Sequence, residues 1–178
     1  DFLGEPVACD GGWYRLPYHG PNSIIGMPEE EKSKSKTLNF RWECPNWQAA
    51  WHGTKFTSVY SILFHGQLRA SQMEALGDRL FEGMEAIYCF QDNLWKKAEY
   101  YLRYEQLGKD GVFWAVMVEL LIDRSMRIIH TPDGDKKKTD QWMQPPGTVK
   151  IANIWLHGRT APQMQDSCDC SLRWQPEA

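Results

Sequence analysis

Three short groups of residues in this chain have side chains that could recognise a ligand. In His52-Gly53-Thr54 the histidine can present a ring nitrogen, and the glycine lets a ligand approach bare backbone. Tyr88 precedes a segment with Tyr100 and Tyr101, and two aromatic rings from neighbouring elements can sandwich a flat ring. Asp140-Gln141-Trp142 follows a loop with three lysines. A turn, a core tyrosine and a solvated strand end explain each group taken singly, so the hypothesis depends on their shared order.

Hydrophobic patterning predicts the elements that position these groups. Residues 48–52 suit a strand, and apolar residues at 56, 59, 60, 63 and 64 predict a helix face behind it. Thr54 or Thr57 can cap the start of that helix, and Gly66 stands where a left-handed C-cap belongs. Residues 86–90 predict a second strand, followed by a helix over 94–106.

The second half of the chain reads as a run of strands. Residues 112–122 are almost continuously apolar, which is typical of a central strand buried on both faces. Strands are also predicted over 126–130, 141–144 and 148–157. This order predicts an α+β fold. We expect an irregular N-terminal extension over 1–46, one domain over 47–160 and a tail over 161–178.

Composition excludes several classes of protein. The net charge of −3 argues against a generic polyanion binder, so any nucleic-acid contact needs a local patch. No apolar stretch is long enough to cross a bilayer, and no signal peptide is found at the start, so we expect no membrane partner. Five scattered cysteines do not form a disulfide framework. Cys168 and Cys170 with His157 are too few converging ligands for a metal, so we expect reduced thiols, no metal site and an intracellular protein.

The three groups together resemble the motifs of the ADP-ribosyltransferases of the poly(ADP-ribose)-polymerase type. The first motif of that family, His-Gly-Ser or His-Gly-Thr and a helix ending in Ile-Leu-x-x-Gly-Leu, is similar to WHGTKFTSVYSILFHGQL at 51–68, with one extra residue. The second, Gly-Ile-Tyr-Phe-Ala-Asp and a helix with a second tyrosine, is similar to 86–100. The family's long strand resembles 111–125, and its last strand pair, with the third motif, resembles 141–156.

The resemblance implies two packed antiparallel sheets with a cleft for NAD, which is a substrate. It implies that His52 bonds the ribose hydroxyls, that the Gly53 backbone holds the nicotinamide carboxamide, and that Thr54 touches the adenine-side ribose. It implies that Tyr88 and Tyr100 stack on the nicotinamide. Residues 77–85 would lie beside this donor, and 131–140 would face the acceptor.

The sequence departs from the family at the third motif. Gln141 stands where the family has Glu, and Asp140, one residue earlier, would face the opposite side of a strand. Glutamine accepts a hydrogen bond but supplies no charge, so we expect no poly-chain elongation. The second-motif serine is also replaced, by Lys97 or Ala98. Glu119, in the apolar strand, is another carboxylate, for which a structural role is favoured.

Three functions therefore stay open. The first is a mono-ADP-ribosyltransferase that modifies a protein or nucleic-acid acceptor, with Gln141 and Asp140 as the candidate catalytic residues. The second is a weakly active or inactive module of the same fold that binds a protein or RNA partner. The third, an NAD-dependent RNA 2′-phosphotransferase, is less favoured because only His52 and Lys97 offer cations. The sequence leaves the acceptor, the compartment and the oligomeric state undetermined.

Overall fold

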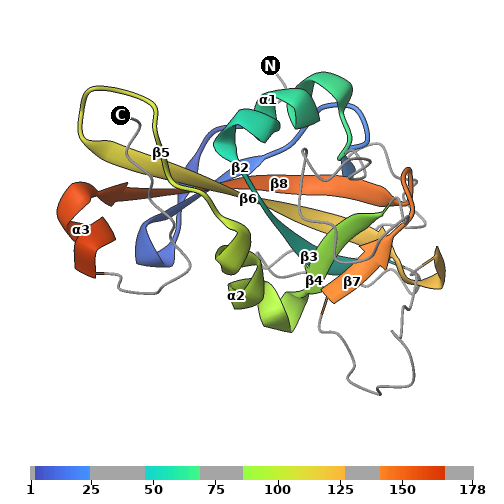
Figure 1. Cartoon of the computed structure of the whole chain (residues 1–178). Coiled ribbons are helices and arrows are strands. Elements are labelled where there is room, and N and C mark those ends of the chain that lie inside the picture. The colour runs from blue at the N-terminus through green and yellow to red at the C-terminus, as the bar shows by residue number, and fades with distance from the viewer. Residues whose placement is uncertain (1–2, 25–46, 69–85, 127–140, 167–178) are drawn as a thin grey trace, which may run out of the picture.

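The computed structural model describes residues 3–24, 47–68, 86–126 and 141–166 of the chain. Its strands form one hydrogen-bonded sheet in the order β1-β2-β8-β6-β3-β4-β7, with β5 added beside β6, and every strand pair is antiparallel (Figure 1). The strands are β1 (Val7–Ala8), β2 (Trp13–Pro17), β3 (Trp47–Thr54), β4 (Ile87–Gln91), β5 (Glu105–Gln106), β6 (Val112–Asp123), β7 (Gln141–Gln144) and β8 (Val149–Thr160). The helices are α1 (Phe56–His65), α2 (Trp95–Ala98) and α3 (Ala161–Asp166), with 3-10 turns η1 (Asp10–Gly12), η4 (Asp92–Leu94), η5 (Glu99–Tyr101) and η6 (Arg124–Met126).

The strand β6 lies in the interior of the sheet, between β3 and β8. Consecutive residues Val116, Met117 and Val118 point to alternate faces, and all are at most 2% exposed. The prediction of a central strand buried on both faces is therefore confirmed. The strands predicted near 48–52, 86–90, 141–144 and 148–157 are confirmed as well, with ends shifted by a few residues at most.

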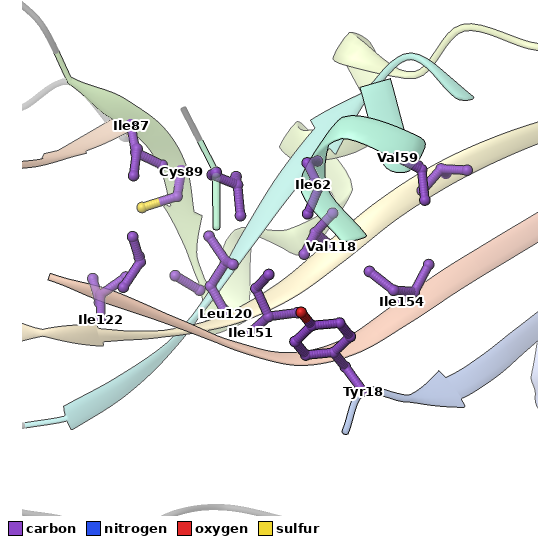
Figure 2. Packing of buried hydrophobic residues seen from close by; sticks show 14 residues of the cluster. Tyr18, Val59, Ile62, Ile87, Cys89, Val118, Leu120, Ile122, Ile151 and Ile154 are labelled. Carbon is purple, nitrogen blue, oxygen red and sulfur yellow. The ribbon is translucent and has the colours of Figure 1, made fainter. Parts of the chain in front are cut away.

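One face of the sheet packs against α1, which lies on the outside of the molecule (Figure 1). Val59 and Ile62 of α1 pack in one cluster with buried branched side chains of β4, β6 and β8, as Figure 2 shows around Val118 and Ile154. Tyr18, which follows β2, is also buried in this core. The core thus ties α1 to the sheet, above all to β6.

The opposite face packs against the short helical stretch from η4 to η5, which Figure 1 shows on the other side of the sheet from α1. Ala98 and Leu102 are buried there against Trp51, Phe90 and Met117. The helix α1 and the stretch from η4 to η5 therefore lie on opposite faces of the sheet.

The connection between β3 and β4 is narrow. Only two residue pairs join them, Ala50 with Gln91 and Trp51 with Phe90. Beyond Trp51 the strand β3 continues beside β6 while β4 continues beside β7. The class is thus α+β with a mostly antiparallel sheet, and a ribbon of β4 and β7 is attached to the main sheet through this short join.

Several expectations for single elements are wrong. Within the stretch expected to be irregular, β2 pairs with β8 over five residues, because its apolar residues complete both faces of the sheet. The single helix predicted over 94–106 is a chain of short helical turns that ends at Tyr101, and Leu102 is already extended. At the predicted strand 126–130, the residue Met126 ends η6, and 127–130 lie outside the described residues.

The helix α1 also differs from its prediction at one end and on one face. Gly66 is the left-handed C-cap, at φ 63°, as predicted, but the N-cap is Lys55 rather than a threonine. The face that packs on the sheet is centred on Val59 and Ile62, so Tyr60 and Phe64 point outward. No helix in the described part of the chain is long and apolar enough to cross a bilayer.

Candidate functional site

The three groups singled out in the sequence lie on neighbouring strands. His52-Gly53-Thr54 ends β3, Tyr88 is in β4, and Gln141 begins β7, and these strands are adjacent in the order β3-β4-β7. In the register of β4 with β7, Tyr88 is opposite Met143, and the backbone of Gln141 is opposite Phe90. Segments up to 89 residues apart in sequence are thus brought within two strand spacings, roughly 10 Å.

His52 connects the first group to the second. Its Nδ1 lies 2.6 Å from the backbone carbonyl oxygen of Tyr88. A carbonyl oxygen can only accept, so Nδ1 carries the hydrogen and donates it. Burial lowers the pKa of His52, and the bond to the Tyr88 carbonyl acts in the opposite direction. The ring is therefore neutral near pH 7, which leaves Nε2 as a hydrogen-bond acceptor.

The edge of β3 next to this histidine is open. From His52 to Thr54 the strand pairs with β6 on one side. On the other side, pairing with β4 stops at Trp51, and no described strand replaces it before the single bridge from Lys55 to Arg103. An unpaired strand edge presents backbone N–H and C=O groups that a ligand can use.

Gly53 lies in close contact with the helical stretch over the sheet. A Cβ built at Gly53 would stand 2.1 Å from the backbone oxygen of Ala98 and 3.0 Å from Cβ of Tyr101. Only glycine allows this approach. The glycine therefore has a packing function in the structure, whatever else its backbone does.

The two tyrosines expected to stack on a ligand are not in contact with each other. Tyr88 is only 8% exposed, and its buried hydroxyl has no hydrogen-bond partner among the residues that the structure describes. Tyr100 is 63% exposed, and no ring contact joins it to Tyr88 in the described part of the chain. Tyr101 instead turns toward the sheet, with its ring centroid 5.7 Å from that of Phe90. The resemblance implies Tyr100, but the 3-10 turn of η5 turns its neighbour Tyr101 toward the sheet.

The remaining expected site residues lie at the end of β3 or outside the described part of the chain. Thr54 is partly buried at the end of β3, opposite Val116 of β6. Asp140, the loops 77–85 and 131–140, and the pair Cys168 and Cys170 lie outside the described residues. Among residues 3–24, 47–68, 86–126 and 141–166 no cluster of three or more potential metal ligands occurs.

Glu119 bonds to residues of β8, on the side of β6 away from β3. Its Oε2 accepts hydrogen bonds from Asn153 Nδ2 at 2.7 Å and from Trp155 Nε1 at 2.8 Å, both on β8. Burial raises the pKa of Glu119, and these two bonds act in the opposite direction. On the β4 side of Trp51, the indole Nε1 donates to Asp92 Oδ1 at 3.1 Å. The two carboxyl groups thus bond to the edges of tryptophans, which fits a structural role.

Neither a scan against models of protein families nor a search of curated proteins finds a match to this chain. What the chain does must therefore be inferred from its residues and their geometry.

Proposed function

We propose that the chain is an NAD-dependent mono-ADP-ribosyltransferase with its site at the open edge of β3. One observation carries the proposal: three sequence groups that resemble one family's motifs lie on three adjacent strands, in motif order. Segments that resembled the motifs only by chance would have no reason to lie on adjacent strands. The proposal includes the finer fold, in which the ribbon of β4 and β7 and the main sheet flank an NAD cleft.

The dinucleotide would bind along the edge from His52 to Thr54. The neutral imidazole would accept a hydrogen bond from a ribose hydroxyl at Nε2, since Nδ1 is occupied by the Tyr88 carbonyl. Backbone groups of Gly53 at the unpaired edge would hold the carboxamide of nicotinamide, and Thr54 would touch the second ribose. The Cβ of Tyr101 lies against Gly53, whereas Tyr100 is 63% exposed, so we assign the stacking partner of Tyr88 to Tyr101 instead of Tyr100.

The reaction would break the bond between C1′ of the ribose and the nicotinamide nitrogen. Both electrons of that bond leave with nicotinamide, and the sugar becomes an oxocarbenium-like cation. A nucleophilic oxygen or nitrogen of the acceptor then donates its lone pair to C1′ and loses a proton. Gln141, at the start of β7, would orient the 2′-hydroxyl through its amide oxygen, and Asp140 precedes it. Without a charge on Gln141 the cation is less stabilised, so we expect slow, single transfers.

A second function is favoured by the packing around Gly53 and Tyr88. The oxygen of Ala98 fills the space over Gly53, and the ring of Tyr88 is buried. A ligand ring can stack on Tyr88 only if the covering segments move. An inactive module of the same fold that binds a protein or RNA partner is therefore the alternative.

The test combines NAD titration by calorimetry with chromatography of released nicotinamide. The wild type is expected to bind NAD saturably, and His52→Ala is expected to lose that binding while keeping its far-UV spectrum. Gln141→Glu is expected to raise the rate of nicotinamide release. Saturable binding without release in either protein would favour the inactive module. No binding at millimolar NAD would refute the NAD site.

A further inference from the structure

We infer that the outer face of α1, with the two cations at its start, binds single-stranded nucleic acid through base stacking and phosphate contacts. This site begins at Lys55, where the open edge of β3 ends, and it does not require NAD binding. It consists of Tyr60, Phe64 and His65 on the helix, with Lys55 and Arg103 at its first turn. We call these five residues the α1 platform.

The aromatic part of the platform is exposed although the sequence pattern predicts it to be inward. Tyr60 is 76% exposed and Phe64 68%. Their rings are nearly parallel, 17° apart, with centroids 6.2 Å from each other, and His65 stands edge-on to Phe64 at 5.1 Å. Val59 and Ile62 already fill the contact with the sheet, so these rings add nothing to the core. Exposed, ordered aromatic rings are the platform on which nucleobases stack.

The basic part of the platform brings two like charges together. Lys55 and Arg103 are backbone neighbours in a bridge, and both side chains are exposed. Neither has an ion-pair partner in the described part of the chain. Lys55 is also the N-cap of α1, at the positive end of the helix, and its side chain makes no capping bond. Adjacent like charges and a cation at a helix start are both unfavourable, and a bound phosphate would relieve both.

The charge of the α1 platform indicates which kind of partner binds there. Residues 55–68 include no aspartate or glutamate, although the whole chain has a net charge of −3. A second copy of the chain that packed through the same face would add the same cations, and its residues 55–68 would add no acid. Two phosphates beside Lys55 and Arg103, with successive bases on Phe64 and Tyr60, satisfy both parts of the platform. A nucleic-acid strand therefore fits better than a self-associated protein.

The experiment measures fluorescence anisotropy of labelled 12-nucleotide oligo(U) and oligo(dT) with the full chain at several salt concentrations. Two phosphate contacts predict that log K falls with log salt at a slope of about −1.4. Lys55→Ala or Arg103→Ala is expected to reduce the slope to about −0.7. Tyr60→Ala and Phe64→Ala are each expected to weaken binding about fivefold or more while keeping the slope, since stacking is not screened by salt.

Matched controls come from elsewhere on the surface. Lys109→Ala removes an exposed lysine from the turn before β6, and Tyr14→Ala removes a tyrosine that is 41% exposed on β2. Both are expected to bind as the wild type does, and circular dichroism checks that every variant is folded.

Both oligonucleotides are expected to bind, because bases and phosphates are common to RNA and DNA. The inference is overturned if neither oligonucleotide binds at protein concentrations up to about 1 mM. It is also overturned if the platform variants and the controls lose affinity equally, or if the salt slope does not change. NAD titration of Tyr60→Ala is expected to match that of the wild type, so failure of either site leaves the other test intact.

Discussion

Replacing Gly53 with alanine is expected to force the helical stretch away from the sheet. The new Cβ would meet the backbone oxygen of Ala98 at 2.1 Å, whereas real Cβ atoms stay beyond 3.0 Å, so one backbone must move by about 0.9 Å. Overpacking of this kind costs about 1–3 kcal/mol. Alanine recovers about 0.4–1 kcal/mol by restricting the unfolded chain, so the middle values of the two ranges leave a net loss of about 1–2 kcal/mol. For a chain of this length the loss lowers Tm by about 2–8 °C.

The assay is thermal unfolding followed by circular dichroism, with Gly158→Ala as the matched control. Gly158 is also inside a strand, but a Cβ there would meet ring atoms of Trp114 at 3.2 and 3.3 Å, and a side chain can give way. The control is expected to stay within about 1 kcal/mol of the wild type. A Gly53→Ala protein that melts at the wild-type temperature would refute the packing of Ala98 on β3. It would also remove the main support for assigning Tyr101 to the site.

Three further predictions concern protonation and the aromatic site. Since burial raises the pKa of Glu119, its ionisation costs stability as pH rises above about 4.5. The Tm of Glu119→Gln is therefore expected to rise relative to that of the wild type from pH 5 to 8. A Tm difference between the two proteins that stays constant over this range would contradict the prediction. Burial lowers the pKa of His157, so the wild type loses stability as pH falls below about 6.5. In His157→Gln the decline of Tm between pH 7 and 5 is expected to be shallower, whereas an unchanged decline would exclude His157. Tyr101→Ala is expected to weaken NAD binding, measured by calorimetry, at least tenfold, roughly the scale of a lost aromatic contact. Tyr100→Ala is expected to weaken it less than threefold. The reverse order would favour Tyr100 as the stacking partner of Tyr88.

Strong local patterns predicted the main elements of the fold. The apolar run at 112–122 is long and flanked by Gly111, and it is the central strand. Gly66 ends α1 because only a residue free to adopt positive φ suits that cap. These features depend on a few neighbouring residues, so one sequence suffices to find them.

Features that depend on tertiary contacts were not predictable in this way. The role of β2 depends on pairing with β8, almost 140 residues later, and no short-range pattern encodes that partner. The orientation of α1 depends on which side chains the sheet accepts. Tyr60 and Phe64 have the same spacing as a buried face, yet the core takes Val59 and Ile62.

The candidate site has the same limits. The order of the three groups predicted that they would lie together, and the strands that carry them are indeed neighbours. The inward tyrosine could not be identified, because a 3-10 turn and an α-helix place consecutive residues at different angles. The hydrogen bond from His52 to the Tyr88 carbonyl also depends on the divergence of β3 and β4, which only the structure reveals.

The structure gives the His-Gly-Thr group a second explanation besides ligand binding. Gly53 is needed for the approach of Ala98, and the Nδ1 of His52 holds the start of the β4 ribbon, so both residues have structural reasons to be present. Their identities alone therefore no longer argue for NAD. Two features have no structural use among the described residues: the Nε2 acceptor of a neutral His52, and the backbone edge from 52 to 54. A replacement such as His52→Asn that keeps the bond to Tyr88 but removes the far acceptor is therefore decisive. If NAD binding is lost while Tm is kept, the acceptor serves the ligand; if Tm falls and binding follows it, the histidine is a structural link.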